Sequence, residues 1–211
     1  QEGRRPQLLD AESTLLNYSL VQGHRPWIEE RMYPSIFINK TKVKLIESGD
    51  IWLSKTPDIP GSISFKSAFP RLCTWAKVDI NTNVFYIFNC HLDHIHNSTR
   101  DLQSIVLINE LKKINSNSLP MILAGDFNES PNEQVRSNIE EHLNLEDPYI
   151  VSGKKEEGTH HKFNGNNEET KRIDWILNSS EFKCHSINIE KTSTNGIFPS
   201  DHFPVWGEFQ L

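Results

Sequence analysis

Apolar residues along the chain form short runs that are bounded by Gly, Pro, Asn or Asp. Runs of this length, rich in β-branched and aromatic residues, are typical of strands. The pattern predicts strands at 35–39, 42–54, 72–80, 83–93, 121–124, 172–177, 185–190 and 203–209. The third and fourth of these meet at an Asn-Thr-Asn sequence, so they are expected to form a long hairpin.

Three other segments carry apolar residues at helical spacing. They cover 7–20, 98–114 and 132–143, and the last is the most polar. In the second segment, Ser98-Thr99-Arg100-Asp101 fits a capping box at the start of a helix. Because the strands fall into two groups with helices between them, the sequence predicts an α+β domain in which stacked sheets are covered by helices.

Size and charge narrow the classes of function. A chain of 211 residues, with 36% hydrophobic and 24% charged residues, is expected to form one domain over 1–211. No apolar run approaches the roughly 18 to 20 residues that a membrane helix needs. The net charge is −6, so the chain has no global basic field that would attract nucleic acid. A phosphate ligand would need local Arg and Lys side chains, or a metal ion.

The three cysteines match neither a disulfide framework nor a zinc site. Cys73 and Cys90 fall nearly opposite each other across the predicted hairpin, so a disulfide is conceivable, although buried free thiols are favoured. The chain begins at Gln1-Glu2 with neither an initiator Met nor a signal peptide. We therefore expect that an upstream part has been removed or that the chain is a fragment.

The segment MILAGDFNESP, from Met121 to Pro131, ends an apolar run with a carboxylate and an amide. In a strand, residues i and i+2 point to the same side, so Asp126 and Asn128 would project together from the strand end. Such a pair could hold a water, a metal ion or a phosphate. Taken alone, the segment is also typical of an Asx-rich turn, which is the more common structure.

Polar residues of this kind recur where strands are predicted to begin or end. They are His91-Leu92-Asp93, Asp126 with Asn128, Arg172 with Asp174, and Ser200-Asp201-His202. Neighbouring strand ends that gather at one edge would form a pocket rich in Asp, Asn and His. Hard oxygen ligands favour Mg²⁺ or Mn²⁺ over zinc, and a His beside a carboxylate is suited to acid–base work or phosphate binding. Loop capping explains any one of these sites equally well, but it does not easily explain all four.

Seven motifs follow in a fixed order: QE, EERMYPSIFINKTKVKLIESGDIWLS, RLCTWAKV, NCHLDH, GDFNESP, RIDWIL and SDHFPV. Each is weak alone. The ordered set resembles the endonuclease/exonuclease/phosphatase superfamily, which includes pancreatic deoxyribonuclease and apurinic endonucleases. It is most similar to the subgroup that carries TW…HLDH…GDFN…RID…SDH, and the resemblance runs through nearly the whole chain.

The resemblance implies a four-layer αββα sandwich of two mainly antiparallel sheets, with an active site at one edge. It also implies hydrolysis of a phosphoester by water, dependent on Mg²⁺ or Mn²⁺. By this resemblance Glu2 would coordinate the metal ion and Asp201 would lie close enough to assist. Asp126 and Asn128 would orient and activate the attacking water and touch the phosphate.

The remaining roles are also carried over from the resemblance. His202 would contact the scissile phosphate or act as a base, held in its tautomer by Asp174. His91 would protonate or stabilise the leaving oxygen, with Glu30 as its partner. Arg71, just before the TW motif, is expected to contact phosphate through its forked guanidinium.

The front of the chain departs from the family pattern. Members begin with a strand that carries an Asn, followed by a helix that leads to the Gln-Glu pair, whereas this chain starts at that pair. Without the first strand and helix, a sheet edge would be exposed, and a partner chain could complete it.

The sequence therefore predicts a Mg²⁺- or Mn²⁺-dependent phosphoester hydrolase, that is, a phosphodiesterase, a phosphatase or a nuclease. The substrate classes of the superfamily include nucleic acid, nucleotides and phospholipid headgroups, and the acidic net charge weakens the first. The alternative is a non-catalytic, truncated member that serves as a binding or assembly component. The cellular compartment is left open by the sequence.

Overall fold

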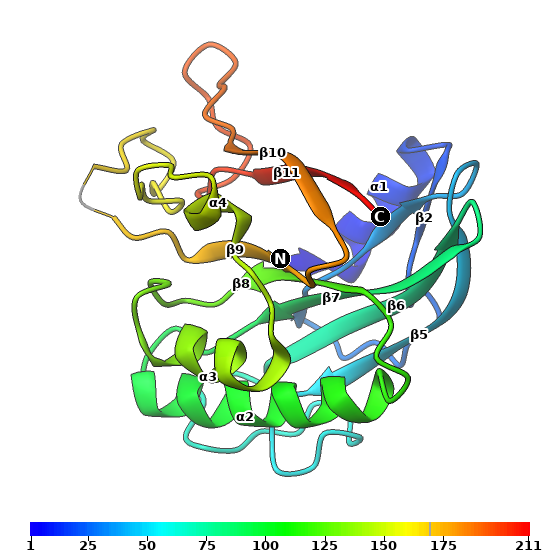
Figure 1. The fold of residues 1–211 in the computed structure, drawn as a ribbon. Coiled ribbons are helices and arrows are strands. Elements are labelled where there is room, and N and C mark those ends of the chain that lie inside the picture. Colours follow the sequence, from blue (N-terminus) through cyan, green and yellow to red (C-terminus); the bar gives the residue numbers. More distant parts are fainter. Residues whose placement is uncertain (169) are drawn as a thin grey trace.

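A computed structural model describes residues 1–168 and 170–211 (Figure 1). The helices are α1 (Arg5–Thr14), α2 (Asn97–Ile114), α3 (Gln134–Leu143) and α4 (Pro148–Val151). The strands are β1 (Gly3–Arg4), β2 (Tyr18–Leu20), β3 (Met32–Tyr33), β4 (Phe37–Asn39), β5 (Lys44–Trp52), β6 (Leu72–Ile80), β7 (Asn83–His91), β8 (Met121–Asp126), β9 (Asp174–Asn178), β10 (Lys183–Ile189) and β11 (Val205–Gln210). The fold is α+β with mainly antiparallel strands, as the sequence predicts.

A five-stranded sheet forms the centre, in the order β5-β6-β7-β8-β9. Neighbouring strands are antiparallel except for β7 and β8, which run parallel and are connected through α2. A parallel pair requires a long crossover of this kind, and the helix covers one face of the sheet. Strands β6 and β7 form the hairpin that the sequence predicts. Because β7, β8 and β9 are neighbours, the ends of three strands that carry polar motifs meet at one edge.

The largest core lies between this sheet and helices α2 and α3, which run beneath it in Figure 1. Leu107 and Leu111 of α2 and Ile139 of α3 are fully buried against Phe88 and Leu123 of the sheet. A fully buried Leu or Phe side chain contributes about 1.5 to 3 kcal/mol. This packing makes the sheet a firm support for the residues at its edge.

The opposite face of the sheet is covered by two strand pairs, β2–β4 and β10–β11. Val78 and Phe85 of the sheet pack there with Ile38 of β4 and Phe182. Helix α1 contributes Leu8 to a further cluster beyond β2. The expected four layers are therefore present, although within the described residues the second layer consists of separate strand pairs. That a partner chain completes this layer remains a prediction.

Two local predictions were wrong. The first helix ends at Thr14 and not at residue 20, because 18–20 is β2, which pairs with β4 and buries Leu20. The expected capping box of α2 does not form, because the helix already begins at Asn97. The carboxylate of Asp93 orders the approach to this helix by accepting hydrogen bonds from the backbone N–H groups of residues 95 and 96.

Cys73 and Cys90 are paired in register across β6 and β7 and are fully buried, and both are free thiols. Burial raises the pKa of each thiol, so both stay protonated and pack as small apolar side chains. The favoured prediction of buried free thiols is thus confirmed. Across the described ranges, no helix combines the length and the apolar character that a bilayer crossing would require.

Candidate active site

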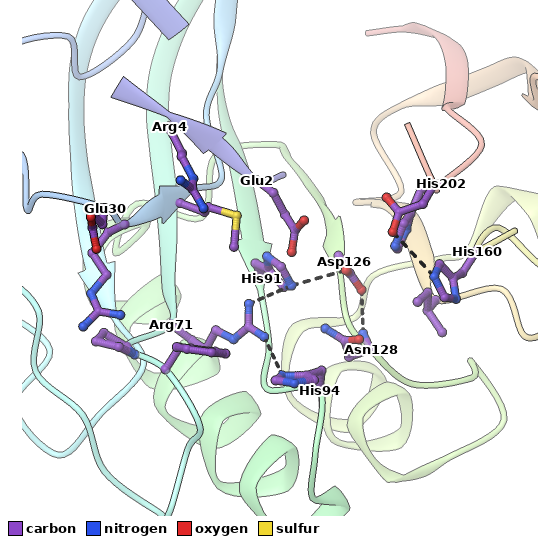
Figure 2. Close-up of a pocket in the computed structure, with 16 residues that line it drawn as sticks. Glu2, Arg4, Glu30, Arg71, His91, His94, Asp126, Asn128, His160 and His202 are labelled. Atoms are coloured by element: carbon purple, nitrogen blue, oxygen red, sulfur yellow. Dashed lines mark hydrogen bonds and ion pairs between the residues drawn. The ribbon is translucent and has the colours of Figure 1, made fainter. Parts of the chain in front are cut away.

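A pocket of about 450 Å³ opens at the edge where the polar strand ends meet (Figure 2). Its lining comprises Glu2, Arg4, Glu30, Arg31, Met32, Phe69, Pro70, Arg71, His91, His94, Asp126, Asn128, His160, Ile173, Asp201 and His202. An adjoining hollow of about 300 Å³ shares Glu2, Asp126, Asp201 and His202 and adds Asp174. Nine residues are expected to have catalytic, substrate-binding or metal-binding roles; eight of them line this pocket, and the ninth, Asp174, lines the adjoining hollow.

Three of these residues form a row across the sheet. His91 of β7 is paired in register with Asp126 of β8, which is paired in turn with Asp174 of β9. The row depends on close packing behind it, because a Cβ on Gly125 would lie 2.2 Å from the carbonyl oxygen of Cys90. The strand register thus fixes the order in which these side chains face the pocket.

Asp126 and Asn128 form a turn and also line the pocket. The backbone N–H of Asn128 donates to Oδ1 of Asp126 at 2.8 Å, which is an Asx turn, and the side-chain amide of Asn128 donates to the carbonyl of Leu92 at 3.0 Å. The predicted strand alternation is wrong, because β8 ends at Asp126 and Asn128 has a positive φ of 51°. The turn leaves Oδ2 of Asp126 facing His91 at 3.3 Å.

Burial dominates the charge state of Asp126, which is only 4% exposed. Burial, together with repulsion from Asp174, raises the pKa of Asp126 to about 7, against the opposing effect of His202 and Arg71. A carboxylate in this environment lacks enough positive charge around it. A cation bound nearby, or a proton, would relieve that deficit.

His91 is held as a neutral ring. Burial, followed by the charge of Arg71, lowers the pKa of His91 well below its usual value. Nη1 of Arg71 donates to Nε2 of His91 at 2.8 Å, so that nitrogen is an acceptor and the proton is on Nδ1. Nη2 of Arg71 donates to Nδ1 of His94 at 3.0 Å, and His94 stacks on Phe69 at 5.8 Å.

Arg71 is an unusual buried cation. It is 9% exposed, and burial lowers its pKa, against the charges of Asp126, Asp93 and Glu2. Within the described ranges its Nε has no hydrogen-bond partner and its guanidinium forms no ion pair with a carboxylate. A buried guanidinium that lines a pocket in this way is suited to an anionic ligand.

His202 faces this row from the far side of the pocket. Its Nδ1 donates to Oδ2 of Asp174 at 2.8 Å, as the sequence predicts, so Nε2 is left for the pocket. Partial burial opposes the charged ring, but the bond to Asp174 and the charges of Asp126 and Asp201 raise the pKa of His202 to about 9. The pair resembles the carboxylate–histidine arrangement that orients catalytic imidazoles.

Glu2 and Arg4 reach the pocket through the short pairing of β1 with β3, in which residue 4 lies opposite residue 32. In Figure 2, Glu2 points toward His91 and Asp126, and Arg4 lies farther out, near Glu30. Sequence reasoning did not identify Arg4 or Arg31 as pocket residues. The strand β1 covers only residues 3 and 4, so the sequence carries no periodic signal that would have identified them.

Three sequence expectations differ from the structure. Glu30 lines the rim but is exposed, and the described partners of His91 are Arg71 and Asp126, so the expected pairing of Glu30 with His91 does not form. Arg172 points away from the pocket into a buried ion pair with Asp147 at 2.7 Å. Asp93 is fully buried and orders backbone instead of facing the cavity.

The donor set fits a hard divalent cation. Five carboxylates, those of Glu2, Glu30, Asp126, Asp174 and Asp201, line the pocket and its adjoining hollow, and the amide of Asn128 also lines the pocket. Asp126, Asp174 and His202 offer donor atoms within 4.8 Å of one another, and two of the three are carboxylate oxygens. Oxygen donors of this kind bind Mg²⁺ or Mn²⁺, and the raised pKa of Asp126 indicates that the site needs positive charge.

Comparison with known proteins agrees with this geometry. A model of the Endonuclease/Exonuclease/phosphatase family matches residues 17–202. A mannosyl-6-phosphatase of Bacteroides thetaiotaomicron shares 29% identity with a TM-score of 0.88, covering 100% of this chain and 84% of that protein. A functionally unknown conserved protein of Enterococcus faecalis shares 28% identity with a TM-score of 0.86, covering 98% and 82%.

A more distant solved structure shares the fold alone. TDP2 of D. rerio, complexed with a single-strand DNA product, has 18% identity and a TM-score of 0.78, covering 100% of this chain and 84% of that protein. The search of curated protein sequences found no match.

Proposed function

The chain belongs to the endonuclease/exonuclease/phosphatase family, and we propose that it is a phosphoester hydrolase that depends on Mg²⁺ or Mn²⁺. The observation that carries this proposal is the row of His91, Asp126 and Asp174 at one sheet edge, with His202 bonded to its last member. Hydrolysis of a phosphoester needs charge neutralisation and a positioned water more than a covalent nucleophile. The row supplies groups for both.

Glu2 and Asp201 would hold the divalent cation, with Asp126 near enough to share its charge. When bound, such an ion polarises phosphoryl oxygens and neutralises the charge that develops on them. Arg71 would bind the phosphate, since its guanidinium lines the pocket and forms no ion pair with a carboxylate in the described part of the chain. This contact would give the acidic pocket an affinity for an anionic substrate.

Asp126 and Asn128 would orient the attacking water. The Asx turn fixes both side chains, and Oδ2 of Asp126 is free to accept a hydrogen bond from that water. His202, held by Asp174, would donate from Nε2 to a phosphate oxygen near neutral pH, and it would act as a base only where the pH is high enough to deprotonate a ring whose pKa is raised to about 9. His91 would stabilise the leaving oxygen, and its hydrogen bond with Arg71 fixes the ring orientation.

The substrate class is proposed as a small phosphoester. The pocket volume of about 450 Å³ suits a ligand the size of a sugar phosphate or a nucleotide. A relative at 29% identity is named a mannosyl-6-phosphatase, which supports a phosphomonoester of a sugar as the first candidate. The DNA product in TDP2 gives weaker support for nucleic acid, because the identity there is 18%.

The test is hydrolysis of p-nitrophenyl phosphate and bis(p-nitrophenyl) phosphate with and without Mg²⁺. His202→Ala is compared with His142→Ala, which changes an exposed histidine of α3. We expect metal-dependent turnover that is lost in the first variant and kept in the second. A folded chain without turnover on either ester or on a sugar phosphate would contradict the proposal and favour the non-catalytic alternative.

A further inference from the structure

A second group of side chains with metal-ligating atoms lies beside the row of strand ends. It consists of His160, Asp201 and His202, whose donor atoms all lie within 4.8 Å of one another. Nε2 of His160 lies 3.7 Å from Oδ2 of Asp201, and the rings of His160 and His202 are 4.9 Å apart (Figure 2). None of the roles proposed above uses His160.

The backbone brings these side chains together. Residues 160 and 202 form an antiparallel bridge, which places the two rings side by side. The bridge is closed on both sides, because the N–H of His161 donates to the carbonyl of Asp201 at 2.8 Å and the N–H of Phe203 donates to the carbonyl of Thr159 at 2.7 Å. The juxtaposition of His160 with Asp201 and His202 is therefore built into the fold and does not depend on side-chain rotamers alone.

The donors differ in kind from those assigned to Mg²⁺. Two imidazole nitrogens and one carboxylate oxygen form the ligand set of open zinc sites, in which a water takes the fourth position. Zinc bonds of 2.0 to 2.1 Å require ligand atoms about 3.3 Å apart in a tetrahedron. The 3.7 Å between His160 and Asp201 reaches that spacing after a small rotation of half-exposed side chains.

The surroundings of His202 also match a zinc ligand. Its Nδ1 donates to Asp174, so Nε2 is the nitrogen that faces the pocket. A histidine that binds zinc almost always donates its other N–H to a carboxylate or carbonyl, which fixes the tautomer and the ring orientation. Asp174 provides that partner, and its own place in β9 is fixed by register with Asp126.

We propose that His160, Asp201 and His202 form a binding site for Zn²⁺, and that zinc bound there lowers turnover by engaging His202. The effect on turnover rests on the proposed function, whereas zinc binding does not. Mg²⁺ binds imidazole poorly and keeps oxygen ligands, so the two ions would share Asp201 but differ in their other ligands. Zinc would thus act as an inhibitor of an enzyme that works with Mg²⁺.

Binding is tested first, without reference to activity. Chelator-treated 211-residue protein is titrated with ZnCl₂ by calorimetry and with CoCl₂ by absorption spectroscopy, in parallel with His160→Phe and the exposed control His142→Phe. Phe keeps a ring at position 160 but removes one of three ligands. We expect one zinc per chain, a tetrahedral cobalt spectrum, and an affinity at least about 10-fold weaker in His160→Phe only.

Two outcomes would overturn the site. One is that the wild-type chain binds no zinc. The other is that His160→Phe binds zinc as tightly as the wild type, which would place the ion on Asp126, Asp174 and His202, a set that this variant leaves intact. If His160→Phe fails to unfold cooperatively on heating, His160→Gln takes its place, since the amide occupies the position without a ring nitrogen.

The effect on turnover is measured with saturating Mg²⁺ and increasing Zn²⁺, as the zinc concentration that halves the rate. We expect this concentration to rise at least about 10-fold in His160→Phe relative to the wild type, in proportion to the loss of affinity. Activation by zinc, or equal inhibition of both proteins, would overturn the inhibitory role. A wild-type protein without any turnover would contradict the proposed function, while the calorimetry would still decide the zinc site.

Discussion

Two walls of the pocket are held in different ways. The sheet wall consists of Arg71, His91 and Asp126, and the loop wall consists of Glu2, His160, Asp201 and His202. Residues of the sheet wall are 4% to 9% exposed and lie at or next to the ends of adjacent strands. In the loop wall, the side chains of His160, Asp201 and His202 are 26% to 37% exposed, and they lie on segments joined by backbone bridges.

The difference in burial indicates that the sheet wall holds its side chains in fixed protonation states, whereas the loop wall can adjust to different ligands. Burial alters the protonation of the sheet wall, raising the pKa of Asp126 to about 7 and lowering that of His91 well below its usual value. The loop wall keeps closer contact with water, and its residues can adjust to different ligands. Rigid elements that hold reacting groups while loops adapt to ligands are a common division of labour in enzymes.

The largest effect is expected from a change in the sheet wall. Asp126→Asn keeps the shape and the acceptor of the Asx turn but removes the carboxylate that would orient water. We expect turnover to fall about 10⁴-fold, the upper range for loss of a general acid or base. Because burial raises the folded-state pKa of this group to about 7, its ionisation lowers stability progressively from about pH 3.9 to about pH 7 and by the full amount above that, so the thermal midpoint at pH 8 should not fall.

Turnover and the thermal midpoint are measured together for this variant. Asp58→Asn, at an exposed position, is the matched control. A variant that keeps more than a tenth of wild-type turnover would show that Asp126 only supports the turn. The proposed division between the two walls would then lose its main evidence.

Asp174 connects the two walls, because it belongs to β9 and bonds His202. Asp174→Asn keeps a side chain of the same size but loses the charge that orients the imidazole. We expect kcat to fall about 10²-fold with a small change in KM, as is typical for the loss of a carboxylate partner of a functional histidine. The amide NH₂ can also select the wrong tautomer of His202.

Steady-state kinetics on the aryl phosphate ester check this prediction, together with the ¹H–¹⁵N spectrum of the histidine rings. A change in the ring tautomer of His202 with full turnover would contradict an orienting role for Asp174. An effect confined to KM would instead indicate that Asp174 acts on substrate binding.

Support behind the sheet wall is expected to matter for stability. Burial would raise the pKa of Asp93, but hydrogen bonds from the N–H groups of Ala68, Ile95 and His96 and from the hydroxyl of Ser67 lower it below 3.8. Asp93→Asn would set an amide donor against one of these donors. We expect a loss of about 2 kcal/mol in the free energy of unfolding at pH 7.

The pH dependence of that loss has a definite sign. A lowered folded-state pKa stabilises the protein above the unfolded value, about 3.9, and this contribution disappears as the pH falls through the folded value. Urea unfolding at pH 7 and at pH 3 should therefore show a smaller difference between wild type and Asp93→Asn at pH 3. A difference independent of pH would attribute the loss to shape and not to charge.

The sheet wall is the part of the pocket that the strand pattern in the sequence predicts best. His91, Asp126 and Asp174 each end or begin an apolar run. The ends of neighbouring strands meet at one edge of the sheet independently of the loop conformations. Glu2 was assigned through the family resemblance alone, since the pairing of β1 with β3 covers two residues and leaves no periodicity. The fold class and the main strands were predicted from the same pattern of apolar runs bounded by polar residues.

Asp201 and His202 of the loop wall were found from their place before a predicted strand, but the position of His160 depends on contacts that no local pattern encodes. His160 meets His202 only because the backbone of residues 159–161 bridges to that of residues 201–203. The expected pair of Glu30 with His91 does not form for a related reason. Arg71, the residue before β6, donates a hydrogen bond to Nε2 of His91 in its place. Similarly, the leucines of 7–20 suggest one helix, whereas pairing of β2 with β4 ends it early.

The smallest effect is expected at the edge of the loop wall. Lys171 forms an ion pair with Glu133, but its side chain is 64% exposed, whereas the side chain of the next residue, Arg172, is 1% exposed and pairs with Asp147. Exposed ion pairs contribute about 0.2 to 1 kcal/mol, so Lys171→Ala should change the free energy of unfolding by less than about 0.5 kcal/mol and leave turnover within twofold. Removing one partner of a buried pair typically costs about 3 to 5 kcal/mol, so Arg172→Ala, measured by the same urea titration, should be far more destabilising. Equal losses in the two variants would mean that exposed and buried ion pairs stabilise the segment leading into β9 to the same extent. Exposure would then not explain how the two walls differ.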